Sequence, residues 1–233
     1  MSRYVQIVFI LSLFTVLACI KSPTALPRSA KPGDTFDLQK LRSIGSAIAE
    51  ARSEKRLPGG VLWVERNGIH FTKAYGKASM KPDYVLTQRN TIYDAASLTK
   101  VVATTPAVLL LHERGNISIN DTVKKYLPEF NGDGRDTVTL QHLLTHTSGL
   151  RPDISLTGWK GHAECIAKCV AEKLRSKPGE QFKYSDINFQ LLDEIIRRVT
   201  GQRLDVFCEK EIFKPLKMTD TGYNPSAAKH NRV

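Results

Sequence analysis

The spacing of apolar residues predicts a first helix soon after residue 34. In "TFDLQKLRSIGSAIAEARSEKR" apolar side chains recur every three or four positions, which is the period of one helix face. Asp34 or Thr35 is placed to cap the start of this helix, and "LPGG" marks its end. The residues of the apolar face are Leu38, Leu41, Ile44, Ile48 and Ala51.

A β-hairpin is predicted next. The segment "VLWVERNGIHFTKAYGKA" contains two β-rich runs joined by Asn67-Gly68. Asn-Gly is a strong hairpin indicator because both turn residues must adopt positive φ. A two-stranded ribbon is only marginally stable, so this pair needs further strands or a covering helix.

The remaining periodic segments are helical. Residues 97–114, "SLTKVVATTPAVLLLHER", are apolar on nearly every side, which predicts a buried helix that bends at Pro106 and ends at Gly115. A short helix is expected in "TLQHLLTH". In "INFQLLDEIIRRVTG" one helix face is apolar and Gly201 ends the helix. That face consists of Ile187, Leu191, Ile195 and Val199, with Asp193, Arg197 and Arg198 elsewhere.

The N-terminus has the pattern of a targeting segment. In residues 1–19, "MSRYVQIVFILSLFTVLAC", Arg3 precedes an uncharged apolar stretch that is shorter than the roughly 20 residues of a membrane span. The ending "VLAC" resembles a bacterial lipobox, which would place lipid on Cys19; ordinary cleavage within "SPTALPRSA" is the alternative. Both predict an exported protein of the bacterial cell envelope, lipid-anchored, periplasmic or extracellular. Residues 20–34 are expected to form a flexible tether.

Composition and charge narrow the classes of function. A chain of 233 residues with 41% apolar content can bury a substantial core, which we place in one domain over 35–233. The net charge is +11, but the basic residues are mixed with acidic ones, as in "ARSEKR" and "CEKEIFK". A solvated basic surface that faces anionic lipid or cell wall is therefore expected, and a nucleic-acid partner is not.

Three cysteines follow Cys19 in the sequence. Cys165 and Cys169 lie one helical turn apart, and His162 lies one turn earlier. A metal site is the alternative here, but no fourth ligand is near, and free cysteine is common in protein cores. We expect Cys165, Cys169 and Cys208 to be packing residues, and we expect no metal or cofactor.

Candidate chemistry begins with "AASLTK", where Ser97 and Lys100 would share one side of a helix. A serine hydroxyl is a weak nucleophile until a base takes its proton, and a lysine that is desolvated by apolar neighbours can be neutral enough to help. The alternative is a serine that caps the helix beside a solvated lysine.

A second candidate element is "GEQFKYSDINF", in which Tyr184, Ser185 and Asp186 precede a helix. A tyrosine near a lysine ammonium can have a lowered phenol pKa and can serve as the base for a serine. In the alternative interpretation Ser185 or Asp186 caps the helix and Tyr184 packs.

Taken in order, these elements resemble the serine β-lactamase and penicillin-binding-protein superfamily, in the branch of class C β-lactamases, D-alanyl-D-alanine peptidases and related esterases. Ser97-Leu98-Thr99-Lys100 matches the first motif, and Tyr184-Ser185-Asp186 falls where the branch has Tyr-x-Asn. The segments "GNISINDTVKKYLPEF", "LQHLLTHTSGL", "KPGEQFKYSD" and "IFKPLKMTDTGYNP" are also similar, so the resemblance covers roughly residues 60–225. It implies an α+β fold in which an antiparallel sheet, represented here by its N-terminal hairpin, accompanies a mainly helical domain.

The resemblance also implies roles. Ser97 would be the acylated nucleophile, Lys100 would assist its activation, and Tyr184 would be the general base. The backbone N–H of Ser97 would donate to the developing oxyanion. Asp186 stands where Asn is usual, and an ionised carboxylate cannot donate to a substrate amide oxygen. An esterase or peptidase-like hydrolase is therefore favoured over an efficient β-lactamase, with a small molecule or a cell-wall peptide as substrate.

A third motif that the resemblance implies is not found in the sequence. The family's third motif, Lys or His followed by one residue and Gly, does not occur after Met218. We therefore expect the N-terminal part of a hydrolase, with its C-terminal strands missing and its activity impaired; the alternative is an inactive envelope protein that binds cell-wall peptides.

A catalytic Ser-His pair of His146 and Ser148 is a weaker alternative to the Ser97 site. No Gly-x-Ser-x-Gly surrounds Ser148, and this stretch is expected to be a structural turn.

Overall fold

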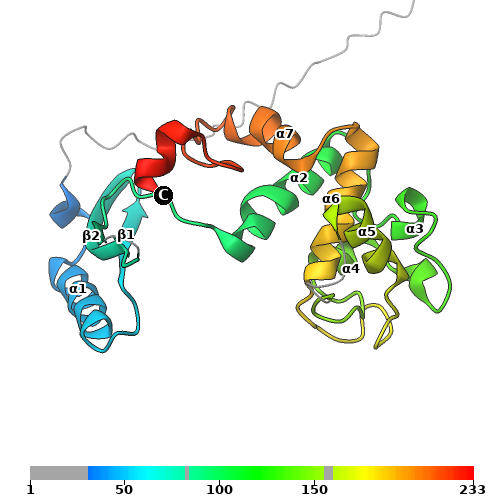
Figure 1. The fold of residues 1–233 in the computed structure, drawn as a ribbon, viewed down its shortest axis with the longest axis horizontal. Helices are drawn as coiled ribbons and strands as arrows, with labels where there is room; N and C mark the ends of the chain where they lie inside the picture. Colours follow the sequence, from blue (N-terminus) through cyan, green and yellow to red (C-terminus); the bar gives the residue numbers. More distant parts are fainter. Residues whose placement is uncertain (1–30, 82–83, 155–159) are drawn as a thin grey trace, which may run out of the picture. The chain divides into compact units, whose positions relative to one another are not determined.

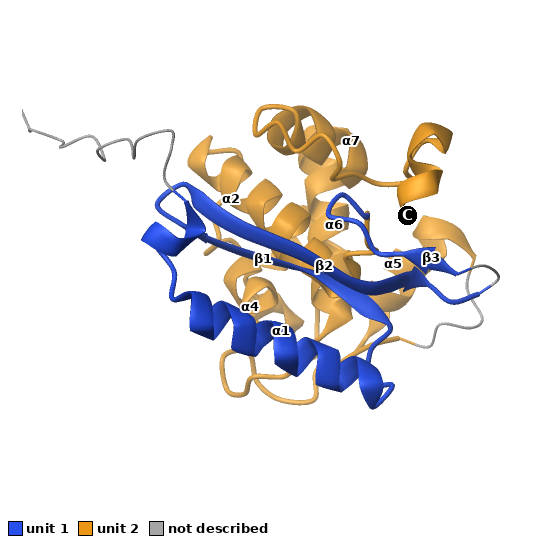
Figure 2. Ribbon diagram, turned by 90° about the vertical axis from the view of Figure 1, so that its left-hand side faces the viewer, with its two compact units in different colours: residues 1–91 blue, residues 92–233 orange. Residues whose placement is uncertain are grey.

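The computed structural model describes residues 31–81, 84–154 and 160–233, which belong to two compact units that meet in sequence at Thr91 and Ile92 (Figures 1 and 2). The predicted signal peptide, Cys19 and residues 20–30 of the predicted tether lie outside the described residues. Within the described ranges, no helix combines the length and the apolar character that crossing a membrane requires. The first unit contains the strands and the second is helical, as the α+β expectation required.

The sheet of the first unit confirms the predicted hairpin. Gly59 pairs with Gly76 at one end of the first two strands, and the turn residues Asn67 and Gly68 have φ of 53° and 76°. A third, two-residue strand was not predicted, because two residues are too few to show an alternating pattern. The strands are β1 (Gly59–Arg66), β2 (Ile69–Ser79) and β3 (Val85–Leu86), antiparallel in the order β1-β2-β3.

One helix, α1 (Leu38–Ser53), runs along this sheet in the first unit (Figure 2). The prediction that Asp34 or Thr35 caps it was wrong. The cap is Asp37, whose Oδ1 accepts the backbone N–H groups of residues 39 and 40 at 2.8 and 3.2 Å. Asp34 instead ends a short 3-10 helix, η1 (Pro32–Asp34).

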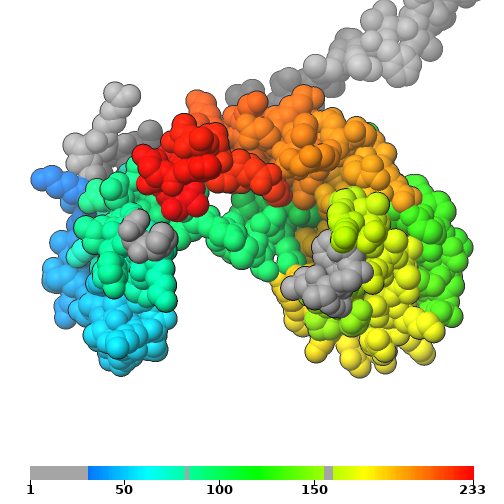
Figure 3. Space-filling view, in the orientation of Figure 1, coloured from blue at the N-terminus to red at the C-terminus, as the bar shows by residue number. Residues whose placement is uncertain are grey.

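The second unit is built from helices joined by short loops. Its α-helices are α2 (Thr105–Glu113), α3 (Val123–Tyr126), α4 (Leu140–Leu144), α5 (Gly161–Ala171), α6 (Asp186–Thr200) and α7 (Leu204–Cys208). The shorter turns are η2 (Ala96–Leu98), η3 (Lys100–Thr104), η4 (Arg135–Thr137), η5 (Glu209–Phe213) and η6 (Ala227–Arg232), of which η3 and η5 are π-helical. The C-terminal turn η6, in red, lies at the molecular surface (Figure 3).

The segment 97–114, predicted as one helix, contains three helix types in succession. It passes from the 3-10 turn η2 through the π-helical turn η3 into α2. Pro106 lies in the first turn of α2, and it has no N–H to donate to the preceding turn. The change of helix type therefore falls at this proline, where a simple bend was expected. Gly115 follows the last turn with φ of 71°, as predicted.

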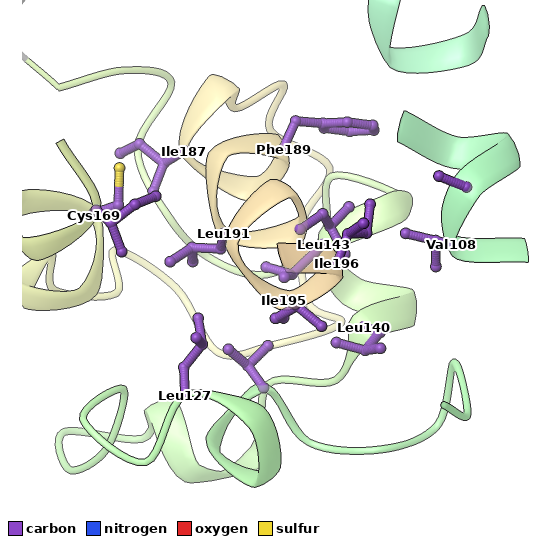
Figure 4. Packing of buried hydrophobic residues seen from close by; sticks show 14 of the residues in the cluster. Val108, Leu127, Leu140, Leu143, Cys169, Ile187, Phe189, Leu191, Ile195 and Ile196 are labelled. Atoms are coloured by element: carbon purple, nitrogen blue, oxygen red, sulfur yellow. The ribbon is translucent and has the colours of Figure 1, made fainter. Parts of the chain in front are cut away.

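The core of the second unit surrounds α6. Its residues Ile187, Leu191 and Ile195 are fully buried, as the periodicity predicted. Figure 4 shows them among side chains that come from α2, α4 and α5, including Val108, Leu143 and Cys169. This packing fixes the start of α6, which carries one of the candidate site residues.

The three cysteines of the described residues are free and buried, as predicted for packing residues. Burial raises the pKa of each thiol, and for Cys208 the value is about 12, so the thiols stay protonated at neutral pH. The structure pairs His162 with Asp193 of α6, with Nε2 and Oδ2 3.0 Å apart. Across the described ranges no cluster of His, Cys, Asp and Glu is arranged to hold a metal ion.

Candidate active site

Ser97 and Lys100 lie one turn apart, at the junction of η2 and η3. Ser97 is exposed, and Lys100 Nζ donates to its Oγ across 3.3 Å. The residue before the serine, Ala96, has φ of 43°, in the left-handed region that a non-glycine residue rarely adopts. The carboxylate of Asp94 holds this conformation by accepting the Ala96 N–H at 2.8 Å. Such strain is typical of functional sites, where the surrounding structure enforces it.

The second candidate element meets the first at Lys100. Asp186 is the first residue of α6, and its Oδ1 lies 2.6 Å from Lys100 Nζ. The same ammonium lies 5.0 Å from the centroid of the Tyr184 ring. The structure therefore brings Ser97, Lys100, Tyr184 and Asp186 together, although they come from distant parts of the sequence. Their catalytic roles stay predictions.

Lys100 is held in its charged form. Burial of the side chain, which is 15% exposed, acts to lower its pKa, but hydrogen bonds with Asp186 and Tyr184 act in the opposite direction and leave the pKa above its usual value. The sequence had suggested a lysine made neutral by its apolar neighbours, and the carboxylate of Asp186 overturns that expectation. As an ammonium, Lys100 can stabilise negative charge on Ser97 Oγ, but it cannot take the proton from it.

Tyr184 is held by a backbone ladder between two loops. The loop after α4, residues 145–152, accepts hydrogen bonds through its carbonyl oxygens from N–H groups of residues 175–186, which lead up to and include the first residue of α6. Gly149 is required within this ladder: its φ is 85°, and a Cβ there would lie 2.2 Å from the Ser176 carbonyl oxygen. The ladder consists of Arg175 N to Gly149 O at 2.7 Å, Gly179 N to Thr147 O at 2.8 Å, Lys183 N to His146 O at 2.8 Å and Asp186 N to Pro152 O at 2.6 Å.

His146 lies beside Tyr184, although the favoured interpretation of its sequence segment was a structural turn. Its ring centroid lies 4.5 Å from that of Tyr184, and its Nδ1 accepts the Ser185 N–H at 3.1 Å. Asn188 of α6 places its Nδ2 3.4 Å from the same Nδ1. No local pattern marks His146 or Asn188, because both contacts form between segments that are far apart in sequence.

Ser148 does not act with His146. Its side chain is 1% exposed, and its Oγ donates to Asn188 Oδ1 at 2.6 Å. This hydroxyl therefore has a structural partner and is not presented to a substrate. The alternative of a His146–Ser148 catalytic pair is thus contradicted by the geometry.

The capping alternative for the second element holds only in part. Ser185 occupies the N-cap position of α6, but its Oγ donates to the Arg151 carbonyl oxygen at 2.7 Å and accepts no N–H of the helix. Tyr184 is 42% exposed and lies outside the core. An exposed phenol beside a paired ammonium fits a reactive group better than a packing residue.

Comparison with known proteins gives consistent matches. A family model described as Beta-lactamase matches residues 44–233. Protein flp of Staphylococcus aureus (strain MRSA252) is 32% identical over 203 residues, which cover 82% of this chain and 40% of that protein. The matched proteins are much longer, and the chain spans about half of their length or less.

Two solved structures are similar in fold. A class C beta-lactamase in complex with cefoxitin has a TM-score of 0.72 and 25% identity, over 84% of this chain and 55% of that one. A D-stereospecific amidohydrolase from Streptomyces has a TM-score of 0.64 and 25% identity, over 76% and 55% of the two chains. The similarity in fold confirms the β-lactamase and D-alanyl-D-alanine peptidase-like fold class that the resemblance implied.

Proposed function

Because the chain belongs to the beta-lactamase family, we propose that it is a serine hydrolase that acts through a covalent acyl-enzyme on Ser97. One observation carries the proposal: the partly buried Lys100 ammonium lies 3.3 Å from Ser97 Oγ and 2.6 Å from Asp186 Oδ1. A helix start that served only folding would not need a partly buried cation beside its serine.

The proposed acylation step assigns a role to each of these groups. Tyr184, acting as a phenolate, takes the proton of Ser97 Oγ on its Oη as Oγ bonds to the carbonyl carbon of the substrate, and the carbonyl π electrons move onto the carbonyl oxygen. The backbone N–H of Ser97 is one donor to that oxygen. The leaving nitrogen or oxygen then departs with its bonding electrons and receives the proton from Tyr184. The Lys100 ammonium stabilises the negative charge that passes over Oγ and Oη.

In deacylation the same groups act again, with a water molecule as the nucleophile and Ser97 Oγ as the leaving group. A water molecule gives one proton to Tyr184 while its oxygen bonds to the acyl carbon. The tetrahedral species then collapses, the bond from that carbon to Ser97 Oγ breaks, and Oγ takes the proton back from Tyr184. The product is a carboxylic acid, and the protein regains its starting state.

The substrate class in this proposal is an ester, an amide or a D-amino-acid peptide, including β-lactam-like compounds. The names of the two similar structures support it, since one is a class C beta-lactamase and the other a D-stereospecific amidohydrolase. Asp186 favours esters and peptides within this class, because an ionised carboxylate offers no donor to the amide oxygen of a β-lactam side chain. The proposed setting is the bacterial cell envelope, which the N-terminal pattern of residues 1–19 supports.

A fluorophosphonate probe tests the proposal. Ser97 Oγ would attack the phosphorus and expel fluoride, which leaves a stable adduct. We expect labelling of the wild-type chain that is lost in Ser97→Ala and kept in Ser46→Ala, an exposed serine of α1. Labelling that persists in Ser97→Ala would contradict the assigned nucleophile. A folded but unlabelled wild-type chain would favour an inactive protein that binds cell-wall peptides.

A separate experiment tests the envelope setting. Metabolic labelling with a fatty acid in a bacterial host is expected to mark the protein, and Cys19→Ala is expected to remove the label. If the mature chain is found unlabelled and begins after residue 19, ordinary cleavage replaces lipidation in the proposal.

A further inference from the structure

Tyr184 is flanked by two hydrogen bonds that end on a single residue. The N–H of Lys183 donates to the carbonyl oxygen of His146 at 2.8 Å, and the N–H of Ser185 donates to its Nδ1 at 3.1 Å. The imidazole also lies against the Tyr184 ring, with centroids 4.5 Å apart and planes tilted by 33°. His146 therefore binds the residues before and after Tyr184 and contacts the Tyr184 ring itself.

The backbone of His146 is unusual. Its φ is 58°, in the left-handed region, where a residue with a Cβ is uncommon. A strained conformation persists only where the surroundings over-determine it. Here the bonds to Lys183 and Ser185 do so, together with the Asn188 side chain, whose Nδ2 lies 3.4 Å from Nδ1.

We propose that His146 is a positioning residue for Tyr184, and that its neutral imidazole keeps the phenol beside Lys100. The proposal rests on the proposed function, since Tyr184 is the general base only there. His146 itself transfers no proton in the reaction. It fixes the chain on either side of the residue that does.

The protonation state of His146 follows from its partners. Because Nδ1 accepts an N–H, the proton of the neutral ring lies on Nε2. Protonation of Nδ1 would set two hydrogens against each other and break the bond to Ser185. Burial and the Lys100 ammonium from η3 lower the pKa of His146, while the Asp186 carboxylate from α6 acts against them. The Tyr184 phenol is the other titratable group that faces the ring.

Two substitutions separate the functions of this residue. His146→Gly relieves the positive φ but removes both Nδ1 and the ring. His146→Asn tolerates positive φ and offers a carboxamide oxygen near the position of Nδ1, yet it does not titrate. His142→Asn is the matched control, because burial also lowers the pKa of His142. This residue caps the start of α4 through its hydrogen bonds with Thr139.

The first measurement is the rate constant of fluorophosphonate labelling at Ser97 between pH 5 and 8. We expect His146→Gly to lower it by about tenfold or more at pH 7.5, a part of the 10²–10⁴ that a general base contributes. His146→Asn should stay within about threefold of wild type, and its rate should decline less on acidification than we expect for wild type. The His142→Asn control should keep the wild-type pH profile.

The second measurement needs no activity. Hydrogen exchange of the Ser185 amide, followed by NMR, should be slow in wild type and in His146→Asn and at least about tenfold faster in His146→Gly. If Ser185 exchanges equally slowly in the glycine variant, the proposal is overturned whether or not the chain is an enzyme. Wild-type labelling kinetics in His146→Gly, with labelling still lost in Ser97→Ala, would overturn it and leave the serine hydrolase intact. A chain that is never labelled would instead refute the proposed function, and the exchange data alone would then decide the role of His146.

Discussion

A single ammonium connects the groups of the candidate site. Lys100 donates to Ser97 Oγ at 3.3 Å and lies 2.6 Å from Asp186 Oδ1, and the Asp186 carboxylate favours the charged form of the lysine. The Asp186 carboxylate therefore has two effects. It favours the charged form of Lys100, and, when ionised, it offers a substrate no hydrogen-bond donor. A family motif that has Asn at this position has no such full negative charge beside its lysine.

Substitution of Asp186 by Asn is expected to lower the pKa of Lys100. It removes the strongest of the contacts that raise this pKa and leaves burial, which lowers it. The ammonium is present below its pKa, so it would be lost at a lower pH than in wild type. NMR titration of ¹³C-labelled lysine measures this shift, and Asp205→Asn, an acid paired with Arg203 away from the site, is the control. A Lys100 pKa that stays at its wild-type value or rises would show that Asp186 does not hold the charge.

At the scale of elements, α6 serves both the core and the site. It begins with Asp186, and one of its charged residues, Glu194, is only 2% exposed. Burial acts to raise the pKa of Glu194, but hydrogen bonds from Arg197 and Arg198 at 2.7 to 2.8 Å outweigh it and keep the carboxyl ionised. Arg198 also donates to Glu129 Oε2 at 3.1 Å, so this cluster links α6 to the loop after α3.

Glu194→Gln is expected to lower the free energy of unfolding by about 2 to 3 kcal/mol. Loss of one partner of a buried ion pair costs about 3–5 kcal/mol, and the arginines here keep some access to water. Urea denaturation followed by circular dichroism measures the change. Glu129→Gln removes an exposed partner of the same Arg198 and should cost less than about 1 kcal/mol. Equal losses in the two variants would mean that the burial of Glu194 carries no special cost.

At the scale of the whole molecule, buried apolar residues are unevenly distributed. In the described part of the first unit they are Leu41, Ala51 and Ile69, whereas the second unit has the large cluster around α6. Several large apolar side chains of the first unit are exposed, among them Trp63 and Leu86. Local stability depends on buried apolar contacts, so it should differ between the units.

Hydrogen exchange is expected to be faster in α1 and in the β1–β2 hairpin than in α6. Fewer buried contacts oppose local opening in the first unit, so its amides should exchange through smaller fluctuations. Deuterium labelling of the intact chain, followed by digestion and mass spectrometry of the peptides, measures this directly. Hairpin peptides as protected as those from α6 would contradict the expectation.

Stability is also expected to fall as the pH is lowered from 7 towards 5. Burial lowers the pKa of His142 and His146 below the usual 6.5, so the unfolded chain binds more protons than the folded one in this range. The stability that they contribute is complete above pH 6.5 and is lost as the pH falls towards their folded values. Asp121, with a pKa of about 2, acts only below about pH 4, and Asp193, whose pKa burial raises, has the opposite sign. Urea denaturation at several pH values should show a flatter profile for the double variant His142→Asn, His146→Asn; an unchanged slope would exclude these histidines.

Local chemistry explains what the sequence alone determined. The Asn67-Gly68 turn requires positive φ, and the apolar period of α6 and its Gly201 stop depend on neighbours within one turn. Ser97 and Lys100 are three positions apart, which places them on one side of a helix. These features, together with the order of the motifs, were sufficient for the α+β class and for the family. Tertiary structure decided what depends on residues far apart in the chain: the charge on Lys100, the burial of Glu194 and the contacts of His146 with the backbone on either side of Tyr184. The physical reason is that pKa values, burial and hydrogen-bond partners are set by the atoms that surround a side chain in space, and folding brings those atoms from segments whose local patterns carry no trace of one another.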